Sequence, residues 1–159
     1  SMKEQACDPR LGRDGPVSIP LTDIRIGDKA SFARTLTEAD AYQFSGIIGN
    51  FNPIHVNKEF AAKTASGQRV IPSMLVTSMA SRILGTQLPG NGTVNVSQEM
   101  EFLAPVFFGD TLECTVTATR IDGKRRRVWF DIECVNQHNE VVACGETEVI
   151  PPDIAGGDQ

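Results

Sequence analysis

The stretch PSMLVTSMASRILGTQLPG, residues 72–90, decides the fold because it is the one long segment with the periodicity of an α-helix. Pro72 suits the first turn of this helix, and Pro89-Gly90 ends it. Its apolar residues recur at spacings of three and four, namely Met74, Leu75, Met79, Ile83 and Leu84. The remaining sides carry Val76, Ala80 and Leu88. A helix that is apolar over so much of its circumference is expected to be buried.

The second half of the chain alternates apolar and polar residues, which is typical of half-buried β-strands. Strands are predicted at a short first segment and at four later ones, over residues 29–35, 94–102, 112–118, 128–134 and 141–149. The later segments are separated by turn sequences, namely Gly109-Asp110, Asp122-Gly123 and His138-Asn139. We therefore expect the four later strands to pair with their neighbours in sequence, in antiparallel fashion.

These elements predict an α+β protein with the hot-dog fold, in which an antiparallel sheet wraps around one long central helix. The helix and the apolar face of the sheet then bury each other. Such a sheet leaves an edge strand open, and pairing of edges between two copies is the usual remedy. We therefore expect a homodimer or a higher even oligomer.

A short helix is predicted before the long one. Thr37-Glu38-Ala39-Asp40 has the form of a capping box, with Thr37 as the first cap and Asp40 favoured by the helix dipole. This helix is expected to reach about Ser45, where Gly46 and Gly49 break it.

The chain then turns at Asn52-Pro53, and Asn57 is expected to cap another short helix that runs through Ala62. His55 lies between the two short helices in this scheme. We therefore expect it on irregular backbone, where a polar side chain is free to face a site.

Length and charge place limits on the class of protein. A chain of 159 residues fits one domain, which we place at residues 21–151, after a disordered or extended segment 1–20 and before a flexible tail 152–159. The net charge of -5 and the absence of a long apolar run give no sign of nucleic acid or a membrane as partner. We expect a cytoplasmic protein.

The cysteines and the basic residues give no clear site. The four cysteines lie far apart, at Cys7, Cys114, Cys134 and Cys144. They form no zinc-like spacing, so we expect no metal and interpret them as reduced core residues. The basic run Lys124–Arg127 follows a turn and is interpreted as the solvated end of a hairpin, the alternative being a contact with phosphates of a nucleotide-bearing substrate.

Several short motifs occur in the order found in one known family, namely Phe44-Ser45-Gly46, Asn50-Phe51-Asn52-Pro53-Ile54-His55, Phe60-Ala61-Ala62, Met74-Leu75, Leu88-Pro89-Gly90 and Phe102-Leu103-Ala104-Pro105-Val106. From about Leu36 to Pro151 the chain resembles the MaoC-like R-specific enoyl-CoA hydratases. The resemblance implies a dimeric hot-dog enzyme, with no cofactor, that adds water reversibly to a trans-2-enoyl thioester and forms an R-3-hydroxyacyl thioester. It implies a CoA or acyl-carrier-protein thioester as substrate.

The resemblance also implies the catalytic residues. His55 matches the family histidine, whereas Asn50 occupies the place of the catalytic aspartate. An amide donates and accepts hydrogen bonds but is not a base near neutral pH. We therefore expect His55 to be the sole acid and base, Asn50 to orient water or substrate, and the activity to be altered or weakened.

Four more residues are expected to contact or position the substrate. Asn52 matches the turn that orients the histidine, and the N–H of Ser73 stands where the family has a glycine N–H for the thioester oxygen. Met74 and Ser78 are expected to line the pocket. The alternatives are that Met74 belongs to the core and that the hydroxyl of Ser78 bonds back to the preceding helical turn.

Two other functions stay open at this point. The first is a catalytically silent acyl-CoA-binding subunit that stabilises an active hydratase, which the missing carboxylate favours. The second is an acyl-CoA thioesterase, because the hot-dog fold supports hydrolysis with other polar side chains. Restoring the carboxylate at Asn50 tests the first, and release of free CoA from acyl-CoAs tests the second.

Overall fold

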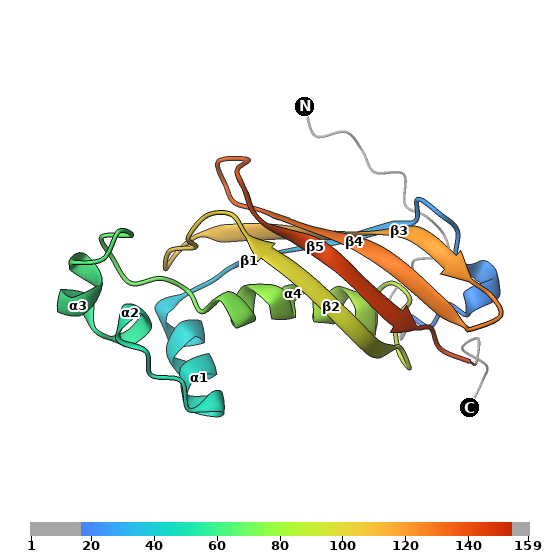
Figure 1. Ribbon diagram of the computed structural model, residues 1–159, viewed down its shortest axis with the longest axis horizontal. Coiled ribbons are helices and arrows are strands. Elements are labelled where there is room, and N and C mark those ends of the chain that lie inside the picture. Colours follow the sequence, from blue (N-terminus) through green and yellow to red (C-terminus); the bar gives the residue numbers. More distant parts are fainter. Residues whose placement is uncertain (1–16, 154–159) are drawn as a thin grey trace.

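The computed structural model describes residues 17–153, and Figure 1 shows a curved antiparallel sheet with one long helix along its concave side. The elements in chain order are η1 (Leu21–Asp23), β1 (Lys29–Thr35), α1 (Glu38–Ile48), α2 (Pro53–Val56), α3 (Lys58–Ala62), α4 (Ser73–Thr86), β2 (Val94–Phe102), β3 (Thr111–Asp122), β4 (Arg127–Val135) and β5 (Val141–Ile150). The three short helices α1, α2 and α3 lie together beyond one end of the sheet (Figure 1). The predicted α+β architecture is therefore confirmed.

The order of the strands differs from the predicted meander. The sheet has the order β1-β3-β4-β5-β2, so Gly109-Asp110 does not join neighbouring strands. The reason lies in residues 103–110, which cross the end of the sheet: Leu103 N–H donates to Val142 O at 2.8 Å and Leu36 N–H donates to Asp110 O at 2.9 Å. The chain thus leaves β2 beside β5 and enters β3 beside β1. The other two predicted turns do join neighbours, β3 to β4 and β4 to β5.

The core lies between the sheet and α4. Its largest fully buried side chains include Phe130, Ile132 and Val149 of the sheet and Ile83 and Leu84 of the helix. The helix is less completely buried than predicted, because Met74, Ser78, Ser81 and Arg82 are exposed on its other side. The polar residues of α4 thus lie on an exposed face of the helix. This face leaves room for a site beside the helix.

Capping residues fix the short helices. Thr37 and Asp40 form the predicted capping box of α1, in which the Thr37 side chain accepts from Asp40 N–H and the Asp40 side chain accepts from Thr37 N–H. Contrary to prediction, the helix continues through Gly46. It ends at Gly49, whose φ of 73° lies in the left-handed region. A helix of this length tolerates one internal glycine at a cost of about 1 kcal/mol.

The expectation for the cysteines needs correction, whereas that for the basic hairpin does not. Cys114 and Cys134 lie directly opposite each other in β3 and β4 and are joined by a disulfide, whereas free thiols were predicted. Cys144 is free, and Cys7 lies outside the described residues. The predicted hairpin end at Asp122-Gly123 is confirmed, and two of its arginines pair with carboxylates, Arg126 with Asp153 and Arg127 with Glu148.

The described residues also bear on the ends of the chain and on other site classes. Most of the predicted segment 1–20 and the tail 152–159 lie outside them, but Ile19 N–H donates to Pro89 O at 2.8 Å. No helix within residues 17–153 is long and apolar enough to cross a membrane. Over the same residues, no group of three His, Cys, Asp or Glu side chains is arranged to hold a metal ion.

Candidate active site

His55 is held inside a four-residue helix, α2, and not on irregular backbone as predicted. Asn52 caps this helix, because its side-chain oxygen accepts from Ile54 N–H at 3.2 Å, and Pro53 sits at the first helical position. Pro is favoured there because its fixed φ suits the helix and its missing N–H is not needed. Asn52 thus caps the helix that carries His55, three residues before the histidine. Its predicted role in orienting His55 would act through this cap.

The ring of His55 has a defined orientation and tautomer. The side chain is only 6 % exposed, and its Nδ1 lies 2.7 Å from Val70 O. A carbonyl oxygen can only accept, so Nδ1 carries the hydrogen of this bond. In the neutral ring Nε2 is then the atom with a lone pair, and nothing within residues 17–153 hydrogen-bonds it. The arrangement leaves Nε2 able to take a proton.

Main-chain hydrogen bonds connect His55 to the start of α4. Val70 N–H donates to Ile54 O at 3.1 Å, so Val70 bonds α2 through both its N–H and its carbonyl. The next residue, Ile71, donates its N–H to Val106 O at 2.7 Å. The segment that leads into α4 is therefore fixed on both sides, and the imidazole is fixed relative to the helix N-terminus.

Asn50 lies just beyond α1 and is exposed. Its N–H donates to Ser45 O at 3.1 Å, and its side-chain oxygen accepts from Asn52 N–H at 3.1 Å. This Asx turn occupies the oxygen, so the free hydrogen-bonding group of the amide is the NH₂ donor. The bond to Asn52 N–H joins two of the predicted site residues, Asn50 and Asn52.

Ser73 and Met74 open α4. The first N–H groups of an α-helix have no partner within it, and the amides of Ser73 and Met74 find no acceptor among residues 17–153. A cavity of about 300 Å³ lies beside this end of the helix, and Val70, Ser73 and Val106 are among its lining residues. Val70, whose carbonyl bonds His55, and Ser73 thus line one cavity, whereas neither His55 nor Asn50 is among its lining residues. Met74 is exposed and is not part of the buried core.

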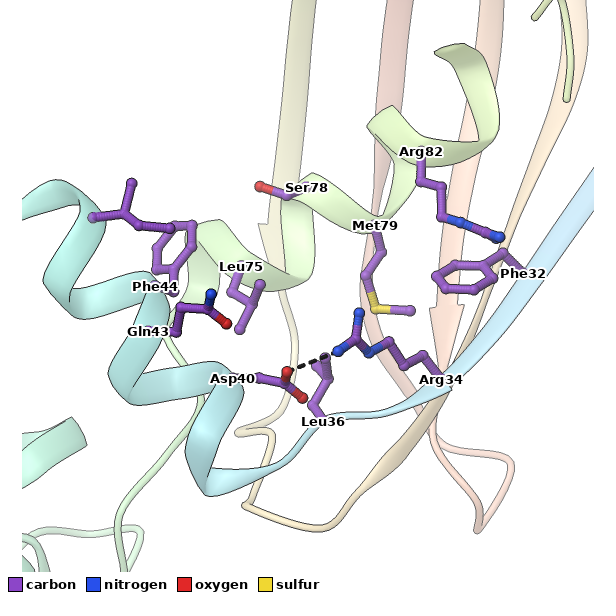
Figure 2. Close-up of a pocket in the computed structure, with 11 residues that line it drawn as sticks. Phe32, Arg34, Leu36, Asp40, Gln43, Phe44, Leu75, Ser78, Met79 and Arg82 are labelled. Atoms are coloured by element: carbon purple, nitrogen blue, oxygen red, sulfur yellow. Dashed lines mark hydrogen bonds and ion pairs between the residues drawn. The ribbon is translucent and has the colours of Figure 1, made fainter. Parts of the chain in front are cut away.

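Ser78 lies one turn further along α4, on a second cavity of about 260 Å³. Its hydroxyl donates to Met74 O at 2.7 Å, which confirms the alternative of a bond back to the preceding turn. Figure 2 shows its side chain near Phe44, Leu75 and Met79, where α1 and α4 approach each other. Ser78 therefore lines a pocket with its hydroxyl hydrogen already in use.

A polar contact that the sequence did not predict secures α2. Tyr42 of α1 donates its hydroxyl to Val56 O at 3.0 Å, and Arg69 donates to the Tyr42 hydroxyl at 3.1 Å and to Glu38 at 2.6 Å. The hydrogen bond that Arg69 donates to Glu38 raises the pKa of its guanidinium above the usual value. Tyr42 and Glu38 are four residues apart on one helix face, but nothing in the residue pattern specifies the distant carbonyl that Tyr42 contacts.

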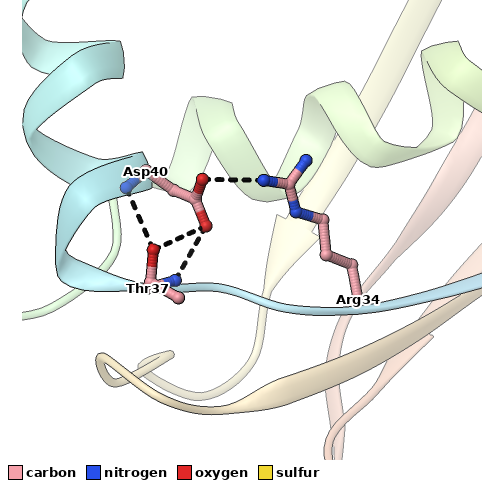
Figure 3. A network of polar contacts seen from close by, with 3 residues as sticks. All are labelled: Arg34, Thr37 and Asp40. Atoms are coloured by element: carbon pink, nitrogen blue, oxygen red, sulfur yellow. Dashed lines mark hydrogen bonds and ion pairs between the residues drawn. The ribbon is translucent and has the colours of Figure 1, made fainter.

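A second network holds the start of α1 against β1 (Figure 3). Arg34 donates to one oxygen of Asp40 at 2.7 Å, and the other oxygen accepts from the N–H and the hydroxyl of Thr37 at 2.9 Å each. The N–H of Thr37 is the main cause that lowers the pKa of the Asp40 carboxyl, and the Thr37 hydroxyl and the Arg34 charge lower it further. The carboxylate has no oxygen left over for a ligand.

Replacing Asp40 with Asn is expected to lower the free energy of unfolding by about 1 kcal/mol at neutral pH, because a cap charge and an ion pair are lost. The folded-state pKa of Asp40 lies below its ordinary value of 3.8, so this stabilisation is complete above that value and is lost as pH falls through the folded pKa. Urea unfolding at neutral and acidic pH measures it. The control is Glu113→Gln, and a difference that grows in acid would contradict the prediction.

The comparisons with known proteins show which family and which fold this chain shares. A family model described as "MaoC like domain" matches residues 23–142. The (R)-specific enoyl-CoA hydratase of Rhodospirillum rubrum is 40% identical, over 82% of this chain and 90% of that protein. The 3-hydroxybutyryl-CoA dehydratase of Methylorubrum extorquens is 35% identical, over 82% of each chain. An R-hydratase structure from Pseudomonas aeruginosa, unliganded, superposes with a TM-score of 0.82 at 30% identity and covers 88% of this chain and 90% of that one.

A family match over this length, together with relatives of this similarity, identifies the class of protein. The chain belongs to the MaoC-like family, and its fold is the hot-dog fold of the solved R-hydratases.

Proposed function

We propose that this protein is a hydro-lyase that adds water reversibly to a trans-2-enoyl thioester of CoA or a carrier protein, with an activity weakened by Asn50. One observation carries the proposal: the buried imidazole of His55 is held by its Nδ1–H on Val70 O at 2.7 Å, so its Nε2 is the basic atom. The similarity to (R)-specific enoyl-CoA hydratase and 3-hydroxybutyryl-CoA dehydratase supports the reaction class.

In this mechanism Nε2 of His55 takes a proton from a water molecule as the water oxygen bonds to C3 of the substrate. The electrons of the C2–C3 double bond move toward the thioester carbonyl, and its oxygen gains negative charge. In this proposal, the free N–H of Ser73, at the positive end of α4, donates to that oxygen. The proton on Nε2 then passes to C2, which completes the addition and restores the neutral imidazole.

Asn50 takes a positioning role in this proposal. Its oxygen already accepts from Asn52 N–H, so its NH₂ group is available to donate to the water or to the substrate. It cannot take the proton that the family aspartate would take, which leaves both transfers to His55. The same observation favours a second candidate function, a silent acyl-thioester-binding subunit, in which the pocket binds without turning over.

Replacing Ser73 with Pro is expected to lower the rate of crotonyl-CoA hydration by about 100- to 1,000-fold, because it removes one oxyanion donor. Proline is tolerated at the first position of a helix, so α4 should still form. The matched control is Ser73→Ala, which keeps the N–H and is expected to keep the rate. The decrease in enoyl absorbance measures hydration, and equal rates for the two variants would exclude the amide as donor.

We also infer a homodimer as the functional unit. β2 pairs only with β5 within residues 17–153, so its other edge has free main-chain groups, and Val94, Val96 and Phe102 on this strand are exposed. In the last turn of α1, Ile47 is 75 % exposed close to Asn50 in sequence. A second copy that covers these residues would exclude water from the site. Sedimentation equilibrium tests this, and a monomer at assay concentrations would contradict it.

A further inference from the structure

The cavity that Ser78 lines is built from one face of each of three elements. β1 contributes alternate residues, among them Phe32 and Arg34, and α4 contributes residues three and four positions apart, among them Met79 and Arg82. α1 closes the third side with Phe44 and its neighbours. Figure 2 shows the two arginines on one side of the cavity and Phe44 on the other. The result is a mostly apolar hollow of about 260 Å³ with cations at one side.

The Arg82 guanidinium is held in a fixed orientation but has no anionic partner among residues 17–153. It lies over the ring of Phe32, with 3.7 Å between the guanidinium carbon and the ring centroid. This stacking fixes the plane of the group and leaves its N–H donors pointing outward at the edge. Within residues 17–153 it makes no hydrogen bond and no ion pair.

Arg34 adds a second guanidinium with donors to spare. One of its nitrogens binds Asp40, and none of its other nitrogens has a partner among the described residues. Asp40 does not neutralise both arginines, because it carries a single negative charge and its ion pair is with Arg34. This side of the cavity therefore carries a net positive charge, on two arginines that are both accessible from solvent.

Planar guanidinium groups bind carboxylates and phosphates through paired hydrogen bonds, and they do so more strongly beside an apolar surface that excludes water. The apolar lining of the cavity suits a hydrocarbon chain. A structural role for Arg82, in which its side chain merely covers Phe32 from water, makes no use of these donors. The two explanations predict different responses to charge on a ligand.

We propose that this cavity is a binding subsite for an oxyanion joined to an apolar chain, with Arg82 as the primary anion-binding group and Arg34 as the second. The subsite extends the proposed function, and in that sense rests on it, by giving the acyl-thioester substrate an anionic group. Arg82 lies about 13 Å along α4 from Ser73, at a rise of about 1.5 Å per residue. A chain of medium length, or the arm of the carrier, is enough to span that distance.

Two parts of a thioester substrate carry such an oxyanion. One is a carboxylate at the far end of the acyl chain, as in a dicarboxylic acyl group. The other is a phosphate of the carrier, in CoA or in the phosphopantetheine arm. Both present the same chemistry to Arg82, so the experiment has to separate them.

The first measurement uses probes that do not depend on thioester chemistry. Calorimetric titration of the full chain with octanoate and with its neutral methyl ester compares an anionic and an uncharged ligand of the same length. We expect octanoate to bind the wild type, and the Arg82→Gln variant to bind it about ten- to a hundredfold more weakly, the range for hydrogen bonds to a charged group. The methyl ester should be unaffected by the substitution.

Arg125→Gln is the matched control, because Arg125 is exposed on the β3–β4 hairpin, beyond α4 and far from α1, and the substitution lowers the net charge equally. It should leave octanoate binding unchanged. Arg82→Lys keeps the charge without the planar fork and should recover part of the affinity. Thermal unfolding of each variant shows that the fold is retained.

The second measurement identifies the source of the oxyanion, by comparing octanoyl-CoA, octanedioyl-CoA and octanoyl-pantetheine. Weaker binding of octanedioyl-CoA alone to Arg82→Gln assigns the subsite to an acyl-chain carboxylate. Weaker binding of both CoA thioesters, but not of octanoyl-pantetheine, assigns it to a carrier phosphate. Octanoate binding that depends on Arg82 while no thioester binds supports the subsite and refutes the proposed function. No octanoate binding, or binding that ignores Arg82, overturns the subsite, whatever the hydratase assay gives.

Discussion

Asn50→Asp is expected to raise the rate of crotonyl-CoA hydration by about 100- to 10,000-fold, the contribution of a positioned general base. The substitution suits the local backbone, because a carboxylate oxygen can accept from Asn52 N–H as the amide oxygen does at 3.1 Å. The second carboxylate oxygen then takes the place of the NH₂ group, so an acceptor replaces a donor. The change is therefore a chemical one at an unchanged turn.

The neighbouring amide provides the control for Asn50→Asp. Asn52→Asp adds the same charge two residues away and keeps the cap of α2, since aspartate caps helices as well as asparagine does. It is expected to give no comparable gain. If Asn50→Asp folds normally and stays as slow as the wild type, the silent binding subunit becomes the better description of this protein.

His55→Ala is expected to lower hydration by at least about 100-fold, and the loss should be largest in the Asn50→Asp background, where there is more activity to lose. The chain offers a matched control in its other histidine, since His138 is exposed in the β4–β5 turn. His138→Ala is expected to leave the rate unchanged. Initial rates of enoyl absorbance loss compare the variants.

A loss in His55→Ala alone does not separate chemistry from folding, because the ring also bonds Val70 O at 2.7 Å. His55→Asn addresses this, since its amide NH₂ can donate to the same carbonyl while Nε2 is gone. We expect this variant to unfold near the wild-type temperature and to be as inactive as His55→Ala. Activity retained in a folded His55→Asn protein would refute the acid and base role.

The sequence predicted the features of the fold that are decided by a few neighbouring residues. The caps at Thr37 and Asn57 are of this kind, because a side chain and an N–H three residues away suffice to define them, whereas Asn52 was predicted as a turn and caps a helix that was not predicted. Strand order is not, since it depends on which edges meet after residues 103–110 have crossed the end of the sheet. Hydrophobic alternation gives each strand a face but no partner.

The disulfide illustrates the same limit at the level of single residues. The turn pairs Asp122 with Arg127, and a regular hairpin continued from there would place Val135 opposite Cys114. An irregularity near Ala118 shifts the register by one residue, so Cys134 takes that place. The cysteines were interpreted as reduced core residues because the sequence does not show the register that brings Cys114 and Cys134 together.

The sequence predicted single residues of the candidate site but not the contacts between them. The motif identified His55, and the predicted start of the long helix placed Ser73 close to its N-terminus. The partner of His55 is a main-chain carbonyl, that of Val70, and every residue type offers one, so no residue pattern points to it. Arg34 and Arg82 were missed because they become neighbours only through the packing of β1 on α4.

The position of His55 and the lining of the neighbouring cavity depend on different groups of the same residues. Its position depends on main-chain groups, the carbonyl of Val70 and the hydrogen bonds of residues 70 and 71 to residues 54 and 106. The side chains of Val70 and Val106, by contrast, line the cavity beside Ser73. Substitutions there are therefore expected to change the shape of the hollow and the ligands that fit it, while the main-chain acceptor for the imidazole stays in place.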